Sequence, residues 1–141
     1  MSIHFFTEDI KYQVKHKSIL KKWLKEAIKA HHYLLQELNV ILCSDDYLYE
    51  MNIKYLDHDT LTDVITFDNS DKEQTVEGDI FISLDRIKEN AQNLNIPFEK
   101  ELHRVIIHGT LHLLGFKDKT SQDQEIMRKI EDFWLEKLVL D

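Results

Sequence analysis

The chain has 141 residues, of which 43% are hydrophobic and 31% charged, with three glycines and one proline. This length is enough for one buried core, and the composition excludes a disordered or linker-rich protein. The formal net charge of −8 argues against a protein that binds nucleic acids whatever their sequence.

The N-terminal segment and the single cysteine bear on the cellular compartment. The first ten residues, MSIHFFTEDI, lack the basic start and apolar centre of a signal peptide. No apolar run is long enough to cross a bilayer. Cys43 lies in the apolar stretch NVILC, which is typical of a core residue in a reducing compartment. We therefore expect a cytoplasmic protein with no signal peptide and no membrane contact.

The first predicted helix covers residues 19–36. Its apolar residues fall on one stripe at 100° per residue, namely Leu20, Trp23, Leu24, Ala27, His31 and Leu34. His31 belongs to this stripe, so we expect it to be packed rather than to bind a ligand. Lysines gather on the opposite side, and residues 11–32 hold seven lysines and one glutamate. That side is either an ordinary solvated face or a contact for a polyanion.

The middle of the chain alternates between strand and helix signals. Apolar and β-branched runs predict strands at 39–44, 62–67 and 79–83. A short helix is expected at 46–55, with Leu48, Met51 and Tyr55 facing inward. Ser83 is placed to cap the helix that follows the third of these strands.

Two further helices complete the chain. The first runs over 97–114, with Pro97 in its first turn and Gly115 ending it in the left-handed conformation. The second covers 122–138, with Ser121 and Gln124 resembling a capping box. Together the segments predict an α/β (α+β) fold in which helices pack on a small mixed sheet.

The helix 97–114 carries two histidines one turn apart. His108 and His112 share a face, and residues four apart on a helix lie close enough for both imidazoles to reach one ion. The helix is apolar nearly all round, which indicates burial. Two buried imidazoles without partners would be costly, and a metal ion would satisfy both.

Asp118 offers a third ligand, because Gly115 can turn the chain back beneath the histidines. Two nitrogens and one oxygen from the protein leave a coordination position open, which is typical of a catalytic rather than a structural site. Cys43 is distant in sequence and is no obvious fourth ligand. The alternative interpretation is a buried histidine pair with an unrelated surface aspartate.

The spacing H-x-x-x-H-x-x-G-x-x-D is similar to that of the metzincin metalloproteases, whose third ligand is usually histidine. Those enzymes need a glutamate directly after the first histidine as their general base. Gly109 occupies that position and has no side chain to accept a proton. A metallopeptidase is therefore a weak third hypothesis.

Three stretches of the chain agree in order and spacing with the motifs of one family. HGTLHLLGFKD (108–118) resembles H-G-x-L-H-L-x-G-Y-D-H, and GDIFIS (78–83) resembles G-D-I-x-I-S. NIKY (52–55) followed by TDVITF (62–67) resembles N-x-x-[FY]-R…T-D-V-L-S-F. These motifs resemble those of the YbeY family of bacterial single-strand-specific metallo-endoribonucleases.

The resemblance implies a mixed four-stranded sheet and one Zn²⁺ ion held by His108, His112 and Asp118. It further implies that residues 1–141 form a single metal-dependent endoribonuclease domain. The substrate would be single-stranded RNA, and the role would be maturation of the 3′ end of small-subunit ribosomal RNA and ribosome quality control. The implied partners are ribosomal RNA and the small ribosomal subunit.

Two residues depart from the family pattern. The third family ligand is usually histidine, whereas this chain has Asp118, which leaves the site one charge less positive and opens it to other divalent metals. The arginine of the N-x-x-[FY]-R motif is replaced by Leu56. Its loss supports a second hypothesis, an RNA- or ribosome-associated binding protein with a mainly structural metal.

No catalytic residue is assigned from the sequence. Glu101 lies two turns before His108 and either orients a ligand or water, or is a solvated acid near the helix N-terminus. His58 either contacts phosphate or has no role. Asp63 either supports the site or caps a strand turn, and His103 points away from His108 and is expected to be structural.

Overall fold

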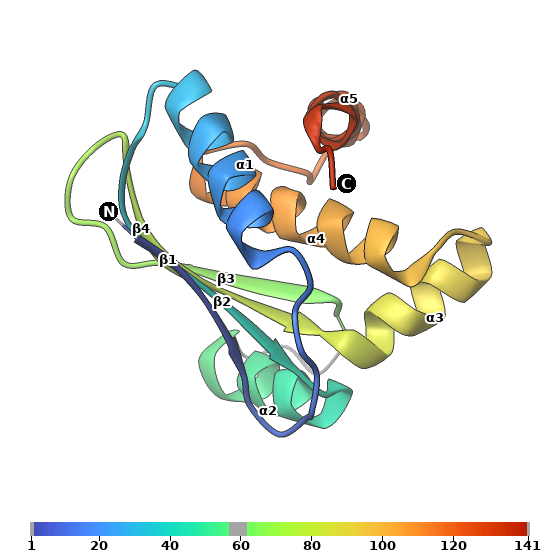
Figure 1. The fold of residues 1–141 in the computed structure, drawn as a ribbon. Coiled ribbons are helices and arrows are strands. Elements are labelled where there is room, and N and C mark those ends of the chain that lie inside the picture. Colours follow the sequence, from blue (N-terminus) through green and yellow to red (C-terminus); the bar gives the residue numbers. More distant parts are fainter. Residues whose placement is uncertain (1, 57–61, 141) are drawn as a thin grey trace.

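The computed structural model describes residues 2–56 and 62–140 (Figure 1). In chain order the elements are β1 (Ser2–Thr7), α1 (Lys17–Ala30), β2 (Leu34–Cys43), α2 (Asp45–Leu56), β3 (Val64–Asp68), β4 (Thr75–Ser83), α3 (Leu84–Leu94), α4 (Phe98–Leu113) and α5 (Ser121–Lys137). These elements confirm the predicted α+β fold with a mixed four-stranded sheet.

The sheet has the strand order β1-β2-β4-β3. β1, β2 and β4 are parallel, and β3 pairs antiparallel with β4 at one edge. α1 and α4 cover one face, α5 packs against the outer side of α4, and α2 lies on the opposite face (Figure 1). Val40, Ile41, Leu42 and Cys43 are all buried, so the C-terminal half of β2 is covered on both faces and its apolar residues need not alternate with polar ones.

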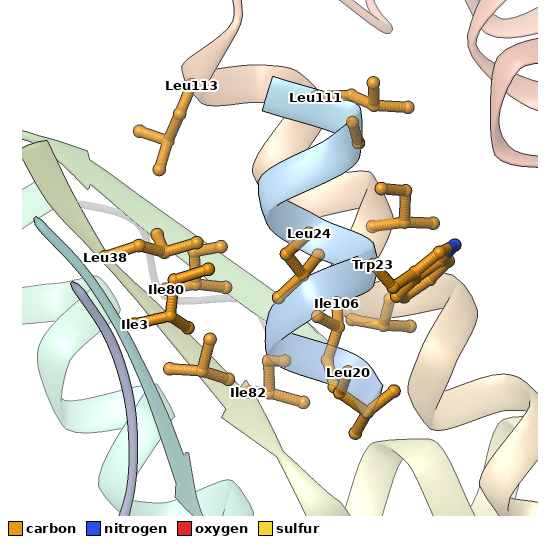
Figure 2. Close-up of a cluster of buried hydrophobic side chains, with 14 of the residues drawn as sticks. Ile3, Leu20, Trp23, Leu24, Leu38, Ile80, Ile82, Ile106, Leu111 and Leu113 are labelled. Atoms are coloured by element: carbon orange, nitrogen blue, oxygen red, sulfur yellow. The ribbon is translucent and has the colours of Figure 1, made fainter. Parts of the chain in front are cut away.

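The main core lies between the sheet and the layer formed by α1 and α4. Figure 2 shows Ile80 and Ile82 of β4 pointing toward Leu24 of α1 and Ile106 of α4. All four side chains are fully buried. Burial of one such side chain contributes about 1.5–3 kcal/mol, so the core holds α4 firmly on the sheet. A rigid α4 matters because it carries both histidines of the predicted metal site.

The prediction of a helix over 19–36 was wrong at its C-terminal end. α1 ends at Ala30, His32 adopts a left-handed φ of 66°, and β2 begins at Leu34. Leu34 continues the helical stripe of the sequence but is 73% exposed in the structure. The strand forms because residues 34–43 pair with β4 and residues 37–42 also pair with β1, and these distant contacts outweigh the helical period of the local sequence.

Three local features also differ from the predictions. The N-terminal strand β1 was not anticipated, because its segment SIHFFT has no regular alternation and, in the part of the chain that the structure describes, pairs with β2 alone. Tyr55 is 57% exposed rather than inward, and Asn52 is buried on α2 instead. The cap of α5 is Thr120, whose hydroxyl accepts a hydrogen bond from the amide of Asp123 at 3.0 Å.

Other local predictions are confirmed. Ser83 caps α3 by accepting a hydrogen bond from the Arg86 amide at 3.2 Å. Gly115 follows α4 with a φ of +93°. Cys43 is fully buried. Within residues 2–56 and 62–140, none of the helices has the length and apolar character required to cross a membrane.

Candidate metal centre

Two imidazoles converge on one side of α4. The Nε2 atoms of His108 and His112 lie 3.0 Å apart, and their rings are nearly perpendicular at 82°. The side chains are 21% and 25% exposed, so they form part of a cavity wall rather than of the closed core. This placement follows from the four-residue spacing on a helix whose other faces are buried.

The turn after α4 brings Asp118 to the same point. The amide of Gly115 donates to the carbonyl of His112 at 3.0 Å, and the amide of Phe116 donates to the carbonyl of Leu111 at 3.1 Å. These bonds, with the left-handed Gly115, form the usual helix-ending turn. Oδ2 of Asp118 then lies 3.3 Å from Nε2 of each histidine.

The three ligand atoms fit a small divalent cation. Nitrogen and oxygen ligands in a tetrahedral zinc site lie about 2.0–2.2 Å from the ion, which places them roughly 3.3–3.5 Å from one another. The two separations of 3.3 Å between Asp118 and the histidines match that spacing, and the separation of 3.0 Å between the histidines is slightly shorter. His108, His112 and Asp118 are also the group of candidate ligands that the described residues bring together within 4.8 Å.

The outer nitrogen of each ring is already bonded. Nδ1 of His108 donates to Oε2 of Glu131 at 2.5 Å, and Nδ1 of His112 donates to the carbonyl of Phe116 at 3.1 Å. A carboxylate and a carbonyl can only accept, so each Nδ1 carries the proton. Both Nε2 lone pairs can therefore point at an ion, which is the usual support for histidine ligands.

Glu131 was missed in the sequence, although it is central to this arrangement. It is 4% exposed on α5, and its Oε1 accepts a hydrogen bond from Nη1 of Arg104 at 2.9 Å. The signal that could have revealed it is its position between Met127 and Trp134, on the buried stripe of α5. A carboxylate in such a stripe requires partners, and here they are Arg104 and His108.

Burial and charge shift several pKa values around the centre. Burial alone lowers the pKa of His108, but the hydrogen bond to Glu131 and the carboxylates of Glu131, Asp118 and Asp63 outweigh it and raise that pKa. Burial raises the pKa of Asp63 and of Glu101. Perturbed carboxyl groups beside a cavity are a common property of functional sites.

Two cavities meet at the three ligands. The β3-side cavity has a volume of about 380 Å³ and is lined by Asn52, Leu56, Thr62, Asp63, Val64, Ile65, Thr66, His108, His112 and Asp118. The α5-side cavity has a volume of about 270 Å³ and is lined by Asp63, Glu101, Arg104, Val105, His108, Asp118, Gln124, Met127, Arg128 and Glu131. Asp63, His108 and Asp118 line both, so the two cavities adjoin at two of the candidate ligands, and together they are called the cleft below.

A larger hollow of about 770 Å³ lies between α2 and the open face of the sheet. Among the described residues, its lining includes Tyr47, Phe67 and Phe81 but no imidazole. The cleft at the histidines is smaller, yet it alone of these cavities combines the ligand trio with perturbed carboxyl groups. The smaller cleft is therefore the candidate catalytic site.

The structure describes three of the four remaining candidate residues that the sequence analysis named. Asp63 lines both cavities of the cleft. Glu101 is 5% exposed, which excludes the alternative of a solvated acid, and it lines the α5-side cavity. His103 is buried and packs edge-on against Trp23, as expected of a structural histidine. His58 lies outside the described residues.

Gly109 explains why this helix differs from a protease helix. An ideal Cβ at Gly109 would lie 2.8 Å from Cγ2 of Ile80 on β4. The residue after the first histidine thus faces the sheet at van der Waals contact and not the cleft. A side chain larger than hydrogen would require a shift of Ile80 and would point at the sheet, so the glutamate base of zinc proteases has no place beside these ligands.

Comparison with known proteins gives a consistent result. The family model for the endoribonuclease YbeY matches residues 2–139. The endoribonuclease YbeY of Cytophaga hutchinsonii is 51% identical and aligns over 93% of this chain and 92% of its own length. The same enzyme of Amoebophilus asiaticus is 44% identical, over 95% of this chain and 91% of its own length.

A solved structure also resembles the chain. The solution structure of TM1509 from Thermotoga maritima superposes with a TM-score of 0.66 and 34% sequence identity, and covers 97% of this chain and 89% of that one. The match with the family model and these relatives confirms the resemblance found in the three sequence motifs. The chain belongs to the endoribonuclease YbeY family.

Proposed function

We propose that this protein is a metal-dependent endoribonuclease that hydrolyses phosphodiester bonds in single-stranded RNA. The observation that carries the proposal is the convergence of His108 and His112 with Asp118 on one wall of an open cleft. We further propose that residues 1–141 act as one catalytic domain. The cellular role would be maturation of the 3′ end of small-subunit ribosomal RNA and ribosome quality control in the cytoplasm, with the small subunit as partner.

The metal ligands in this proposal are His108, His112 and Asp118. Two nitrogens and one carboxylate oxygen suit Zn²⁺, and the carboxylate also admits harder divalent ions such as Mn²⁺. When bound, the ion would stabilise negative charge on the phosphate and activate water for attack. Glu131 and the Phe116 carbonyl hold the two imidazoles in the orientation that such binding requires.

The other groups of the cleft are suited to a phosphodiester rather than a peptide. Gly109 places no base beside the ligands, because it faces Ile80 of β4 and has no side chain. Asp63 lines the cleft and has a raised pKa, so it keeps its proton to a higher pH than an exposed aspartate does. A positively charged centre within an acidic protein would also limit non-specific RNA binding.

A second candidate function has one observation in its favour. Leu56 lines the β3-side cavity at the position where the family motif has arginine, and it provides no charge for a phosphate. An RNA- or ribosome-associated binding protein with a mainly structural metal would tolerate this change. The two candidates differ in whether the metal-loaded protein cleaves RNA with multiple turnovers.

The test uses metal-loaded protein, a single-stranded RNA and an unstructured protein as substrates. Wild type is compared with His112→Ala and with His4→Ala, a control that removes an exposed histidine of β1 that lines neither cavity. The proposal expects cleavage of RNA alone, lost in His112→Ala and retained in His4→Ala. RNA cleavage that survives in His112→Ala indicates a contaminating nuclease and refutes the proposal.

Elemental analysis tests the ligand set separately. Wild-type protein is expected to hold one equivalent of metal, and Asp118→Ala is expected to hold clearly less after dialysis. Full metal content in Asp118→Ala would remove Asp118 from the ligands. The identity of the retained element decides between zinc and the other divalent ions.

A further inference from the structure

The α5-side cavity differs from the β3-side cavity in its charge. Among the described residues, the lining of the β3-side cavity includes no lysine or arginine. The α5-side cavity is lined by two, Arg104 and Arg128. An RNA strand that crosses the ligand trio therefore meets permanent positive side chains on the α5 side.

The guanidinium of Arg104 is already hydrogen-bonded within the protein. Its Nη1 donates to Glu131 at 2.9 Å and its Nη2 donates to Asp132 at 3.1 Å, and its side chain is only 19% exposed. These bonds neutralise the guanidinium and hold α5 against α4. Arg104 is therefore unsuited to bind a phosphate as well.

Arg128 is free by comparison. Its side chain is 68% exposed, and its Nε lies 3.8 Å from Oε1 of Glu131, too far for a hydrogen bond. No other ion pair of Arg128 occurs within residues 2–56 and 62–140. The guanidinium thus keeps its paired donors available at the mouth of the cavity, and a planar fork of this kind binds phosphate oxygens in pairs.

Glu131 relates Arg128 to the candidate metal centre. Its Oε2 accepts from Nδ1 of His108 at 2.5 Å, while its Oε1 is the atom nearest to Arg128. One carboxylate therefore separates the guanidinium from a ligand ring. Two successive phosphates of one RNA strand can span so short a separation, with one phosphate at the ligands and the next at Arg128.

The cavity wall also has unmet hydrogen-bonding capacity. Glu101 is 5% exposed, lines this cavity, and has an Oε1 atom without a hydrogen-bond partner among the described residues. Such an atom favours a polar occupant over an apolar one. The carboxylates of Glu101 and Glu131 repel a phosphate from the interior, so the phosphate belongs at the mouth, where Arg128 lies.

We propose that the α5-side cavity is a subsite for the nucleotide next to the cleaved bond, and that Arg128 binds the phosphate of that nucleotide. The inference rests on the proposed function, because it takes single-stranded RNA as the ligand. It adds a substrate-binding residue outside the three matched motifs. Arg128 holds the strand and the ligand trio receives the bond to be cleaved.

The experiment measures the affinity of the metal-loaded protein for a phosphorothioate-protected single-stranded RNA at several salt concentrations. Wild type is compared with Arg128→Ala, Arg128→Lys and Lys129→Ala. Lys129 is the matched control, because it is the next residue of α5, is 76% exposed, pairs only loosely with Glu125 at 3.6 Å and lines neither cavity. Arg128→Ala and Lys129→Ala change the net charge equally.

Arg128→Ala is expected to weaken binding about five- to tenfold and to raise KM more than it lowers kcat. Each phosphate contact to a single strand contributes about −0.7 to the slope of log affinity against log salt, so Arg128→Ala should lose roughly that amount. Arg128→Lys should keep most of the slope with weaker affinity, since it keeps charge but not the fork. Lys129→Ala should match wild type.

If Arg128→Ala and Lys129→Ala both bind RNA with the affinity and salt slope of wild type, the proposed subsite is overturned. RNA cleavage by wild type would still support the proposed function in that case. Equal losses in both variants would also overturn it, because they would indicate a general charge effect. A wild type that neither binds nor cleaves RNA would refute the proposed function itself and the subsite with it.

Discussion

His108 and Glu131 form a direct hydrogen bond, with Nδ1 of the histidine 2.5 Å from Oε2 of the glutamate. The two residues are 23 positions apart and lie on different helices. The bond fixes which nitrogen of His108 is free, and the second oxygen of Glu131 binds Arg104. The candidate metal centre and the packing of α5 on α4 thus share one carboxylate.

Glu131→Ala tests whether this carboxylate supports both the candidate metal centre and the packing of α5 on α4. The change leaves Arg104 partly buried without its main partner and frees the His108 ring, so we expect a loss of about 3–5 kcal/mol in the free energy of unfolding. Metal affinity should fall about 10- to 100-fold. Urea denaturation and metal titration measure the two effects. The control is Asp132→Asn, which alters the 57% exposed partner of Arg104 and should change neither quantity strongly.

Removal of the metal is expected to lower thermal stability. An ion that binds only the folded state adds about 2.7 kcal/mol when its free concentration is about 100 times the dissociation constant. Wild type should therefore melt at a lower temperature after chelation and recover when Zn²⁺ is returned. Asp118→Ala should respond much less to either treatment. Identical responses of wild type and Asp118→Ala would contradict the role of the carboxylate.

Gly109→Ala is expected to destabilise the protein, although alanine favours helices by about 1 kcal/mol over glycine. The added Cβ would lie 2.8 Å from Cγ2 of Ile80, an atom held close to the β4 backbone. Overpacking of this kind costs about 1–3 kcal/mol, which exceeds the gain in helix propensity. Chemical denaturation measures the sign directly. A more stable Gly109→Ala variant would mean that α4 and β4 can separate easily.

We expect the free energy of unfolding to fall in mild acid because of His103. Burial lowers its pKa, an effect that Glu99 opposes and His16 reinforces, so the unfolded chain binds this proton more readily than the folded one. The contribution of His103 is then complete above its ordinary pKa of about 6.5 and is lost as the pH falls through the lower folded value. The measurement is unfolding free energy against pH for wild type and His103→Gln. The difference between the two curves should shrink on acidification, and a constant difference would show that His103 does not titrate differently on folding.

The sequence predicted those parts of the site that depend on local geometry. His108 and His112 share a face because of helical spacing, and Gly115 turns Asp118 toward them through hydrogen bonds within a few residues. The position of Glu131 on the apolar stripe of α5 could have indicated its burial, but its contact with His108 depends on how α5 packs on α4 and could not be predicted locally. Glu101 was left undecided for a related reason, since the helix around it alone did not reveal that the fold buries it.

The same distinction explains the errors in the fold. His31 and Leu34 follow α1 and extend its apolar stripe in the sequence, yet β2 begins at Leu34 because this strand pairs with β1 and β4. β1 was missed because its only partner in the described sheet is β2. Elements whose stability comes from strand pairing are the ones that a period along the chain predicts least well.

The anchoring of α5 has a consequence for motion. Trp134 donates from Nε1 to Nε2 of His31 at 3.1 Å, its carbonyl accepts from Trp23 at 2.7 Å, and Glu131 binds His108. Detachment of the last helix would therefore free a ligand ring at the same moment. Ion binding should slow amide hydrogen exchange throughout α5, including turns that lie far from any ligand, and the C-terminal helix would then report the occupancy of the centre.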